Sequence, residues 1–354
     1  MSEIIILGDI AFNGILSTEP EKNKKRFKNI SPILNKSEIV FANLEVPLKV
    51  DDTKNEYKNI IHYSSPEPTE QLLKMFNIGC VSLANNHIYD CKMPGLKATI
   101  SLLDKLCIHH TGAGWLPEHI EPAIIEQEQQ NIGFLSYVDQ STNPKTKNFP
   151  ELYINYFTKE KVLNDIKKIK SSVDKIIVSI HWGVDYSHYQ TPRQITIAHD
   201  LINAGVDIIM GHHPHTLQPF EKYKDGHIFY SLGGLTFGDF WNPDKKNFQA
   251  LYRKTKKGLI ACHNLFSNSF SFISTRELKG NYIKITKRNF EFWNRRKWRI
   301  FNLKSKSRLI GKLVTFKEKI LDRFFEYFFG FYQNPIKRLF QIHNLKKVKR
   351  LYKT

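Results

Sequence analysis

Cysteine is scarce in this sequence, and its spacing argues against two classes of site. The 354 residues contain four cysteines, and no two of them form a C-x-x-C pair. Disulfide frameworks and zinc knuckles need cysteines at close, paired spacings, so neither is expected. The pattern fits reduced thiols in a cytosolic protein.

Long apolar runs are also missing. No stretch of about eighteen uncharged apolar residues occurs, so no transmembrane helix is expected. The N-terminal apolar run is too short for a signal peptide and has no basic residues ahead of it. We therefore expect a cytoplasmic protein. Its 41% hydrophobic content is sufficient for a packed core.

Acidic residues are scarce near the C-terminus. Residues 288–354 contain 19 lysines and arginines but four aspartates and glutamates, which gives this segment +15 of the total net charge of +19. This change in composition predicts a boundary between a domain at residues 1–287 and a basic, helical extension at residues 288–354.

Within the extension, Lys312–Tyr332 has the spacing of an amphipathic helix, with apolar residues at intervals of three and four. Packing on the domain is one interpretation. The phenylalanines and nearby basic clusters also suit a helix on an anionic membrane surface, which would make the protein peripheral on the inner face of the membrane. Binding of nucleic acid is the least favoured of the three.

Apolar segments alternate with helical patterns through most of the chain. This alternation predicts an α/β fold, with helices on the faces of a parallel or mixed sheet. Strands are predicted at 3–7, 39–42, 78–83, 132–138, 175–180, 206–210 and 228–231, and helices at 23–35, 66–76, 95–106, 159–171 and 192–205.

Polar residues cluster directly after five of the predicted strands. Ligands bind at the carboxyl ends of strands in open α/β sheets, so neighbouring strand ends can bring these side chains into one pocket. Each residue could instead have a purely structural role, such as stabilising a turn. Such roles would then have to occur by coincidence at all five strand ends. The residues are Asp9, Glu45, Asn86 with His87, His181, and His213 with His215.

The segment Ile208–His215, I-I-M-G-H-H-P-H, carries three imidazoles within four residues. Its glycine permits a sharp turn after the strand, and its proline restricts the backbone between two histidines. In an extended segment His213 and His215 face the same way, while His212 points elsewhere. The spacing therefore favours a metal site.

Carboxylate, amide and imidazole ligands without thiolate suit zinc, manganese or iron. A carboxylate that bridges two such ions lets the water between them lose its proton near neutral pH, which yields a nucleophile for a phosphoryl or carbonyl centre. An imidazole that is not bound to metal can protonate the leaving group. A divalent metal, as one ion or two, is the expected cofactor.

Six motifs occur in order along the chain: Gly8-Asp9, Asn43-Leu44-Glu45, Ala84-Asn85-Asn86-His87, His181-Trp182-Gly183, Gly211-His212-His213-Pro214-His215 and Tyr230-Ser231-Leu232-Gly233. Together they resemble the CapA family, which is named for the synthesis of poly-γ-glutamate capsules and is similar to the calcineurin-like metallophosphatases. The resemblance covers about residues 1–245. It implies a four-layer α/β/β/α sandwich.

The resemblance also assigns six residues to metal binding. Asp9 and His215 would bind a first ion, and Glu45 would bridge the two ions. Asn86, His181 and His213 would hold the second ion. Metallophosphatases usually have Asp-x-His at the first motif, whereas Ile10 and Ala11 follow the aspartate here, so the first ion loses an imidazole.

His87 would be the general acid by the same resemblance. Four residues in or near the motifs are further candidates for contact with the substrate: Asn85, His212, Asp185 and Arg193.

The leading hypothesis is a CapA-type metal-dependent hydrolase or transferase that acts on an anionic capsule or exopolysaccharide polymer, or on its precursor. The bond would be a phosphoester or an amide. One alternative is a non-catalytic scaffold of capsule assembly, which the missing imidazole at Ala11 favours. Another is a metal-independent peptide epimerase, in which His87 or His215 moves a proton at carbon.

Overall fold

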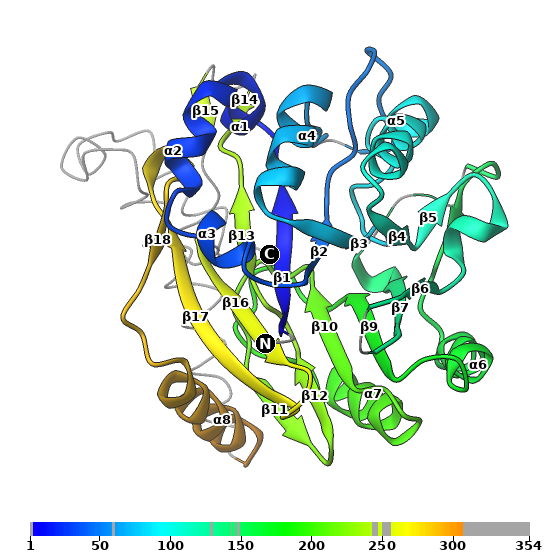
Figure 1. The fold of residues 1–354 in the computed structure, drawn as a ribbon, viewed down its shortest axis with the longest axis vertical. Helices are drawn as coiled ribbons and strands as arrows, with labels where there is room; N and C mark the ends of the chain where they lie inside the picture. Colours follow the sequence, from blue (N-terminus) through cyan, green and yellow to red (C-terminus); the bar gives the residue numbers. More distant parts are fainter. Residues whose placement is uncertain are drawn as a thin grey trace, which may run out of the picture.

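The computed structural model describes residues 3–306, apart from 59–60, 128–129, 143, 145, 147–148, 243–246 and 250–255. Within these residues two β-sheets pack face to face, and helices cover their outer sides (Figure 1). The predicted four-layer α/β/β/α sandwich is confirmed. The predicted helix at Lys312–Tyr332 lies outside the described residues.

The first sheet has eight strands, in the order β18-β17-β16-β1-β2-β3-β4, and β13 also pairs with β1. Its parallel strands are β1 (Glu3–Ala11), β2 (Ile39–Leu44), β3 (Ile78–Ser82), β4 (His109–Thr111) and β13 (Gly234–Phe237). The antiparallel side consists of β16 (Lys257–Asn264), β17 (Ser269–Glu277) and β18 (Ile283–Ile285).

The second sheet has six strands, in the order β11-β12-β10-β9-β7-β6. Its four inner strands are parallel: β12 (Gly226–Phe229), β10 (Ile208–His212), β9 (Lys175–His181) and β7 (Ile132–Val138). The edges are antiparallel and consist of β11 (Phe220–Tyr223) and β6 (Ala123–Ile125). Two small sheets join β5 (Ala113–Gly114) to β8 (Tyr153–Ile154), and β14 (Phe240–Asn242) to β15 (Asn247–Gln249).

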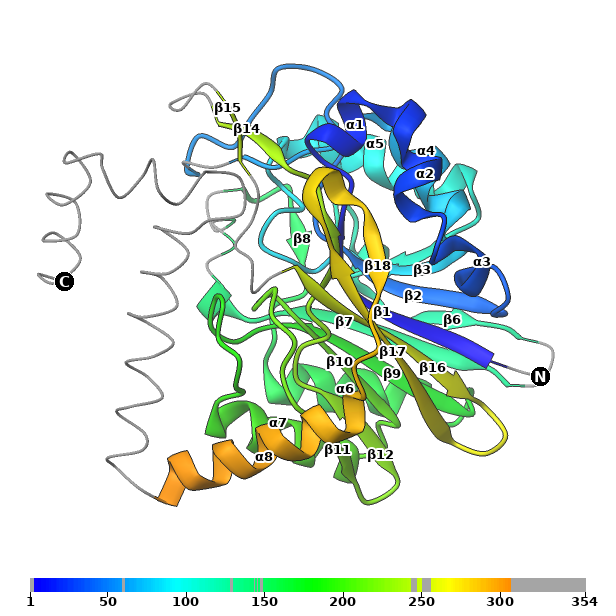
Figure 2. The same cartoon turned by 90° about the vertical axis from the view of Figure 1, so that its left-hand side faces the viewer.

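The helices fall into two groups on opposite sides of the sheets (Figure 2). The first sheet is covered by α1 (Ile15–Thr18), α2 (Asn23–Phe27), α3 (Ser31–Leu34), α4 (Pro66–Met75) and α5 (Lys92–Lys105). The second is covered by α6 (Lys159–Ile169) and α7 (Pro192–Asn203). The last described helix is α8 (Phe290–Lys306).

Strand β1 shows how the layers form. Side chains alternate between the two faces of a strand, so Ile5 packs with the helices that cover the first sheet, whereas Ile4 and Ile6 pack against the second sheet. Between the sheets, the rings of Phe41 and Phe134 lie 5.5 Å apart. One buried apolar layer therefore joins the two sheets.

The structure corrects one of the predicted helices. The helix predicted at 23–35 is broken into α2 and α3, because Pro32 has no amide to continue the hydrogen-bond ladder and instead lies in the first turn of α3. At the start of the basic extension predicted at residues 288–354, Phe290 on α8 is buried in the layer between the sheets, and the domain boundary stays a prediction. No helix among the described residues has the length and apolar character needed to cross a bilayer.

Candidate metal centre

Strands β1 and β2 bring the acidic residues of the site together. Asp9 lies near the end of β1, where it is the register partner of Asn43 in the parallel neighbour β2. Glu45 directly follows β2, and its amide donates a hydrogen bond to the carbonyl of Ile10 (3.0 Å). Both carboxylates are fully buried. Pairing of the two strands therefore holds two acids inside the protein.

Strands β9 and β10 bring the histidines to the same place. β9 ends on His181 and β10 on His212, and these two residues are register partners. The chain then leaves the extended conformation, with φ of 90° at His213 and 52° at His215. Residues other than glycine seldom adopt this left-handed region, and each costs about 1–3 kcal/mol. The turn places the amide of His213 3.4 Å from Oδ2 of Asp9.

Asp9, Glu45 and His215 form the first group of ligands. Their ligand atoms lie within 4.8 Å of one another, and all three residues are buried. The His215 ring stands between the acids, with Nδ1 3.2 Å from Asp9 Oδ2 and Nε2 3.4 Å from Glu45 Oε1. Two carboxylates and one imidazole suit a hard or borderline divalent ion.

His181, Asn86 and His213 form a second group beside the first. His181 Nε2 lies 3.0 Å from Asn86 Oδ1 and 4.0 Å from Glu45 Oε1. The rings of His181 and His213 are 4.9 Å apart. Glu45 therefore lies between the two groups. The structure brings all six predicted ligands together, and their binding of metal stays a prediction.

Several polar atoms of the centre are buried without a hydrogen-bond partner among the described residues. They are both carboxylate oxygens of Glu45, Nε2 of His212 and Nδ1 of His213. An unsatisfied buried group costs about 1–3 kcal/mol, and native proteins contain few of them. A cation among these atoms would satisfy several at once, so the residues present fit a divalent metal.

The electrostatics of the centre also favour a cation. Burial raises the pKa of Glu45 well above its usual value, and the charge of Asp9 adds to this effect. Burial opposes ionisation of Asp9, but the imidazoles of His212 and His215 hold its pKa well below its usual value. For His215, burial is outweighed by Glu45 and Asp9, which raise its pKa to about 9. Near neutral pH His215 therefore carries a positive charge beside the two acids, which a bound metal would replace.

Two histidines are neutral and suited to binding a metal. Burial lowers the pKa of His181 well below its usual value and that of His213 to about 4. Neutral imidazole is the form that coordinates ions. Asn43 orients this part of the centre, because its side-chain amide donates to Asp9 Oδ1 (2.9 Å) and lies 3.3 Å from His181 Nδ1. Asn43 belongs to the motif Asn43-Leu44-Glu45, from which no role was predicted for it.

His87 belongs to a separate group at the edge of the centre. Its Nδ1 lies 2.7 Å from Asp90 Oδ2. Lys58 Nζ donates to Asp90 Oδ1 (2.5 Å) and to the carbonyl of Asn86 (2.5 Å), and it lies 3.1 Å from His87 Nδ1. Burial and the charge of Lys58 lower the pKa of His87 well below its usual value. No sequence pattern marked Lys58, which lies in an irregular loop.

Two of the predicted substrate contacts are held inside the protein. The sequence predicted that His212 points away from the other histidines, and this prediction is wrong. The His212 ring is fully buried, and its Nδ1 lies 3.2 Å from Asp9 Oδ1. The extended backbone that the prediction assumed ends at His212, so side chains do not alternate beyond it. Asn85 is also fully buried, and its side chain donates to the carbonyl of Leu44 (2.9 Å) and accepts from the amide of His87 (3.0 Å). It therefore holds the loop together, and its contact with a substrate stays a prediction.

The other two predicted substrate contacts are exposed. Asp185 lies next to the centre, with Oδ1 3.1 Å from His213 Nε2. Arg193, at the start of α7, donates to Asp139 Oδ2 (2.5 Å). Contact of Asp185 and Arg193 with a substrate stays a prediction.

Comparison with known proteins identifies the family. The family described as "Bacterial capsule synthesis protein PGA_cap" matches residues 3–239. The chain belongs to this family. All six predicted metal ligands of this PGA_cap protein lie inside the matched segment.

Two curated relatives of this PGA_cap protein confirm the resemblance to CapA. A Bacillus anthracis protein named "Capsule biosynthesis protein CapA" is 33% identical over 242 residues, which cover 66% of this chain and 58% of the relative. A Bacillus subtilis (strain 168) protein named "PGA biosynthesis protein CapA" is 30% identical over 258 residues, which cover 71% of this chain and 67% of the relative. The chain thus spans 58% and 67% of the length of these two relatives.

Two solved structures are similar at greater distance. The calcineurin-like phosphoesterase YfkN from Bacillus subtilis is 15% identical, with a TM-score of 0.43, and the match covers 80% of this chain and 88% of that one. A 5'-nucleotidase precursor from Thermus thermophilus is 12% identical, with a TM-score of 0.40, over 77% of this chain and 54% of that one. At these values neither structure identifies the reaction of this PGA_cap protein.

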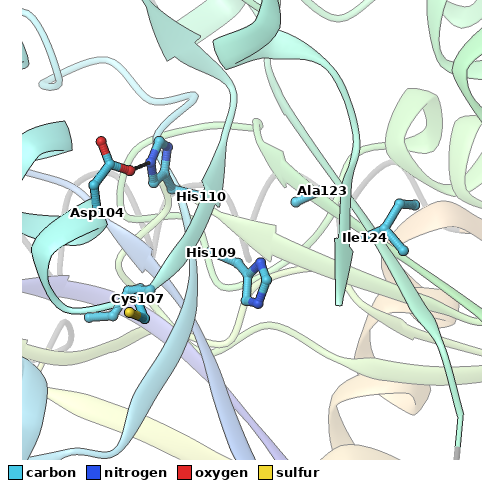
Figure 3. Close-up of a pocket in the computed structure, with 7 residues that line it drawn as sticks. Asp104, Cys107, His109, His110, Ala123 and Ile124 are labelled. Atoms are coloured by element: carbon cyan, nitrogen blue, oxygen red, sulfur yellow. Dashed lines mark hydrogen bonds and ion pairs between the residues drawn. The ribbon is translucent and has the colours of Figure 1, made fainter. Parts of the chain in front are cut away.

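A hollow elsewhere on this PGA_cap protein also contains histidines (Figure 3). His110 Nε2 is paired with Asp104 Oδ1 (2.9 Å). None of the predicted site residues lines the hollow, which is formed by Asp104, Cys107, Ile108, His109, His110, Ala123 and Ile124. The centre at Asp9 and Glu45 is therefore the site to which the sequence motifs correspond.

Proposed function

We propose that this PGA_cap protein is a metal-dependent hydrolase of the CapA type. It would cleave a phosphoester or an amide bond during the synthesis or trimming of a capsule, poly-γ-glutamate or exopolysaccharide polymer. The observation that carries the proposal is Glu45, a fully buried carboxylate without a hydrogen-bond partner among the described residues, between two groups of ligands. Membership of a capsule synthesis family supports the link to the polymer.

Each ligand has a role in this proposal. Asp9, Glu45 and His215 would hold a first ion, and Asn86, His181 and His213, beside Glu45, would hold a second. A bound divalent ion such as manganese, zinc or iron would lower the pKa of a coordinated water and so supply the nucleophile. Asn43 keeps Asp9 and His181 in place through its side-chain amide.

One feature of the first group favours a single tightly held ion. Ala11 stands where metallophosphatases usually carry a histidine, and it packs in an apolar cluster with Val46 and Phe237. The first group therefore has two carboxylates and one imidazole, without a further ring. The same feature favours the second candidate function, a scaffold of capsule assembly that has lost catalysis.

His87 is the residue proposed to protonate the leaving group. Asp90 accepts a hydrogen bond from its Nδ1 when that atom carries the proton, which leaves Nε2 free to exchange a proton with a substrate. Because the pKa of His87 is lowered in the protein alone, the ring is neutral near pH 7. The negative charge of an anionic substrate would raise that pKa, so that His87 becomes protonated and can act as the acid. This requirement fits an anionic polymer or its precursor as the substrate.

The proposal is tested with the full chain and the variant Glu45→Gln, which keeps the shape of the side chain and removes its charge. We expect the unmodified protein to retain a transition metal and to hydrolyse either bis(p-nitrophenyl) phosphate or a γ-glutamyl amide. Glu45→Gln should lose more than about tenfold in metal affinity and in activity. Glu221→Gln is the matched control, because Glu221 bonds to Tyr230 and His199 away from the centre.

Other outcomes would favour the alternatives. Stoichiometric metal without hydrolysis of either substrate would support the scaffold. Metal-free protein whose hydrolytic activity survives His213→Ala would contradict the proposal. Exchange of solvent deuterium into a peptide substrate, without metal, would support the epimerase.

A further inference from the structure

Helix α8 has an inner face that is fastened to the domain. Phe290 is buried in the layer between the sheets. The side chain of Asn294 accepts a hydrogen bond from the amide of Phe220 and donates one to its carbonyl, both at 2.8 Å. Trp298 Nε1 donates to the same carbonyl (2.8 Å). Phe220 lies on β11, an edge strand, so α8 covers a sheet edge and is held rigidly there (Figure 2).

The outer face of α8 is basic and carries an exposed aromatic ring. Phe292, Arg295, Arg296 and Arg299 follow the spacing i, i+3, i+4 and i+7, so they lie on one side of the helix. All four are exposed, and Phe292 is 64% exposed. We call these four residues the arginine face.

The arginines of the arginine face have no ionic partner within the described part of the protein. None of the three forms a salt bridge or a side-chain hydrogen bond with another described residue. Glu291, the acidic residue nearest to the face in the helix, is exposed and is not paired with Arg295. Three guanidinium groups are therefore available to an external anion.

We propose that the arginine face binds the anionic surface of a lipid bilayer, with Phe292 entering the boundary between headgroups and acyl chains. The arginines would pair with lipid phosphates, which attract basic residues near the surface. Phe292 decides between partners, because a bilayer offers it an apolar phase and a soluble polyanion does not. The charge of +15 over residues 288–354 adds attraction to the same kind of surface.

This inference is independent of the reaction at the metal centre. The arginine face contains none of the proposed ligands, and its inner side packs against β11. Loss of membrane binding would leave hydrolysis of a soluble substrate unchanged, so failure of one proposal can be told from failure of the other.

The test is flotation of the full chain with vesicles of phosphatidylcholine, alone or mixed with phosphatidylglycerol. The variant R295Q/R296Q/R299Q removes three charges from the arginine face. Its matched control, K24Q/K25Q/K28Q, removes three charges from exposed lysines on and just after α2. All variants keep residues 307–354, so the contribution of that segment is the same in each.

We expect the unmodified chain and the lysine control to bind the anionic vesicles equally. The arginine variant should bind at least about tenfold more weakly, since each basic residue near the surface contributes severalfold. Phe292→Ser should weaken binding to vesicles without changing binding to soluble poly-glutamate. Circular dichroism of each variant confirms that the fold is intact.

Three results would overturn the proposal. The first is absence of binding by the unmodified chain. The second is equal binding by the arginine variant and the lysine control. The third is a loss of poly-glutamate binding in the arginine variant combined with no effect of Phe292→Ser on vesicles, which would assign the face to a soluble polyanion.

Discussion

Two clusters in this chain each bury a pair of carboxylates, and they differ in how the charge is balanced. In the first, Asp239 and Glu277 share Lys256, whose Nζ lies 3.1 Å from Asp239 Oδ1 and 2.9 Å from Glu277 Oε2. Glu277 Oε1 accepts a further hydrogen bond from Thr236 Oγ1 (2.8 Å). This cluster contains its own cation and its own donors.

The second cluster is the candidate metal centre, where no lysine of the described residues lies between Asp9 and Glu45. Glu45 approaches ring nitrogens at 3.4 and 4.0 Å, but neither oxygen has a hydrogen-bond partner among the described residues. A buried ion pair is stable only when its geometry and donors are complete. Lys256 therefore completes the first cluster, whereas both oxygens of Glu45 remain without a hydrogen-bond partner among the described residues, which fits a cation from outside.

Removing the internal cation should give the largest effect. Lys256→Met leaves two buried carboxylates without their partner, so the free energy of unfolding should fall by about 3–5 kcal/mol. Urea unfolding followed by circular dichroism measures the change. The control Lys24→Met, at an exposed position on α2, should leave stability unchanged. A small change in Lys256→Met would show that the cluster does not depend on this lysine.

Removing a metal ion from the candidate metal centre should give the second largest effect. A metal present at about 100 times its Kd stabilises a protein by about 2.7 kcal/mol, and a chelator abolishes that gain. We expect this loss in the unmodified chain and not in Glu45→Gln. A melting temperature that is the same with and without chelator in the unmodified chain would argue against a metal centre.

The two glutamates should respond differently to the same substitution in metal-free protein. Glu277→Gln loses charged hydrogen bonds and should destabilise the fold by about 1–3 kcal/mol. Glu45→Gln should change stability by less than about 1 kcal/mol, because neither oxygen of Glu45 has a hydrogen-bond partner among the described residues to lose. Parallel urea titrations decide between them, and equal losses would remove the distinction between the clusters.

A buried histidine away from both clusters should give the smallest effect. Burial, with His263 nearby, lowers the pKa of His227 to about 4. The unfolded chain binds this proton at about pH 6.5, so the stabilisation is complete above pH 6.5 and is lost as the pH falls toward 4. Between about pH 6.5 and pH 5 the loss should be about 1–2 kcal/mol.

The substitution His227→Gln tests this pH dependence. It should flatten the decline of stability between about pH 7 and pH 5 in urea titrations, because glutamine does not titrate. A variant with the same pH slope as the unmodified chain would show that His227 does not contribute.

The elements of the fold were largely predictable, because their signals are local. The strand predicted at 132–138 is β7 at Ile132–Val138, and the helix predicted at 66–76 is α4 at Pro66–Met75. Strand ends were less accurate, since β1 continues to Ala11 beyond the predicted residue 7. Its extra residues are paired by β2 and β13, which are distant in sequence.

The residues around the centre were predictable only in part. Strand ends and the histidine cluster identified the six proposed ligands. Lys58 was missed because it reaches His87 and Asp90 from an irregular loop, where no periodicity marks a residue. His212 was misplaced because the left-handed backbone at His213 follows from tertiary contacts and not from local preference.

By itself the sequence determined which residues could serve as ligands, since each follows a short apolar segment whose strand conformation depends on its own pattern of side chains. Tertiary structure alone decided that a lysine lies between Asp239 and Glu277, while the pair at Glu45 has none among the described residues. Lys256 and Glu45 are both charged residues beside apolar segments, and only the pairing of distant strands determines what each one meets. Buried charges are governed by their neighbours in space, and those neighbours come from strands far apart in the chain.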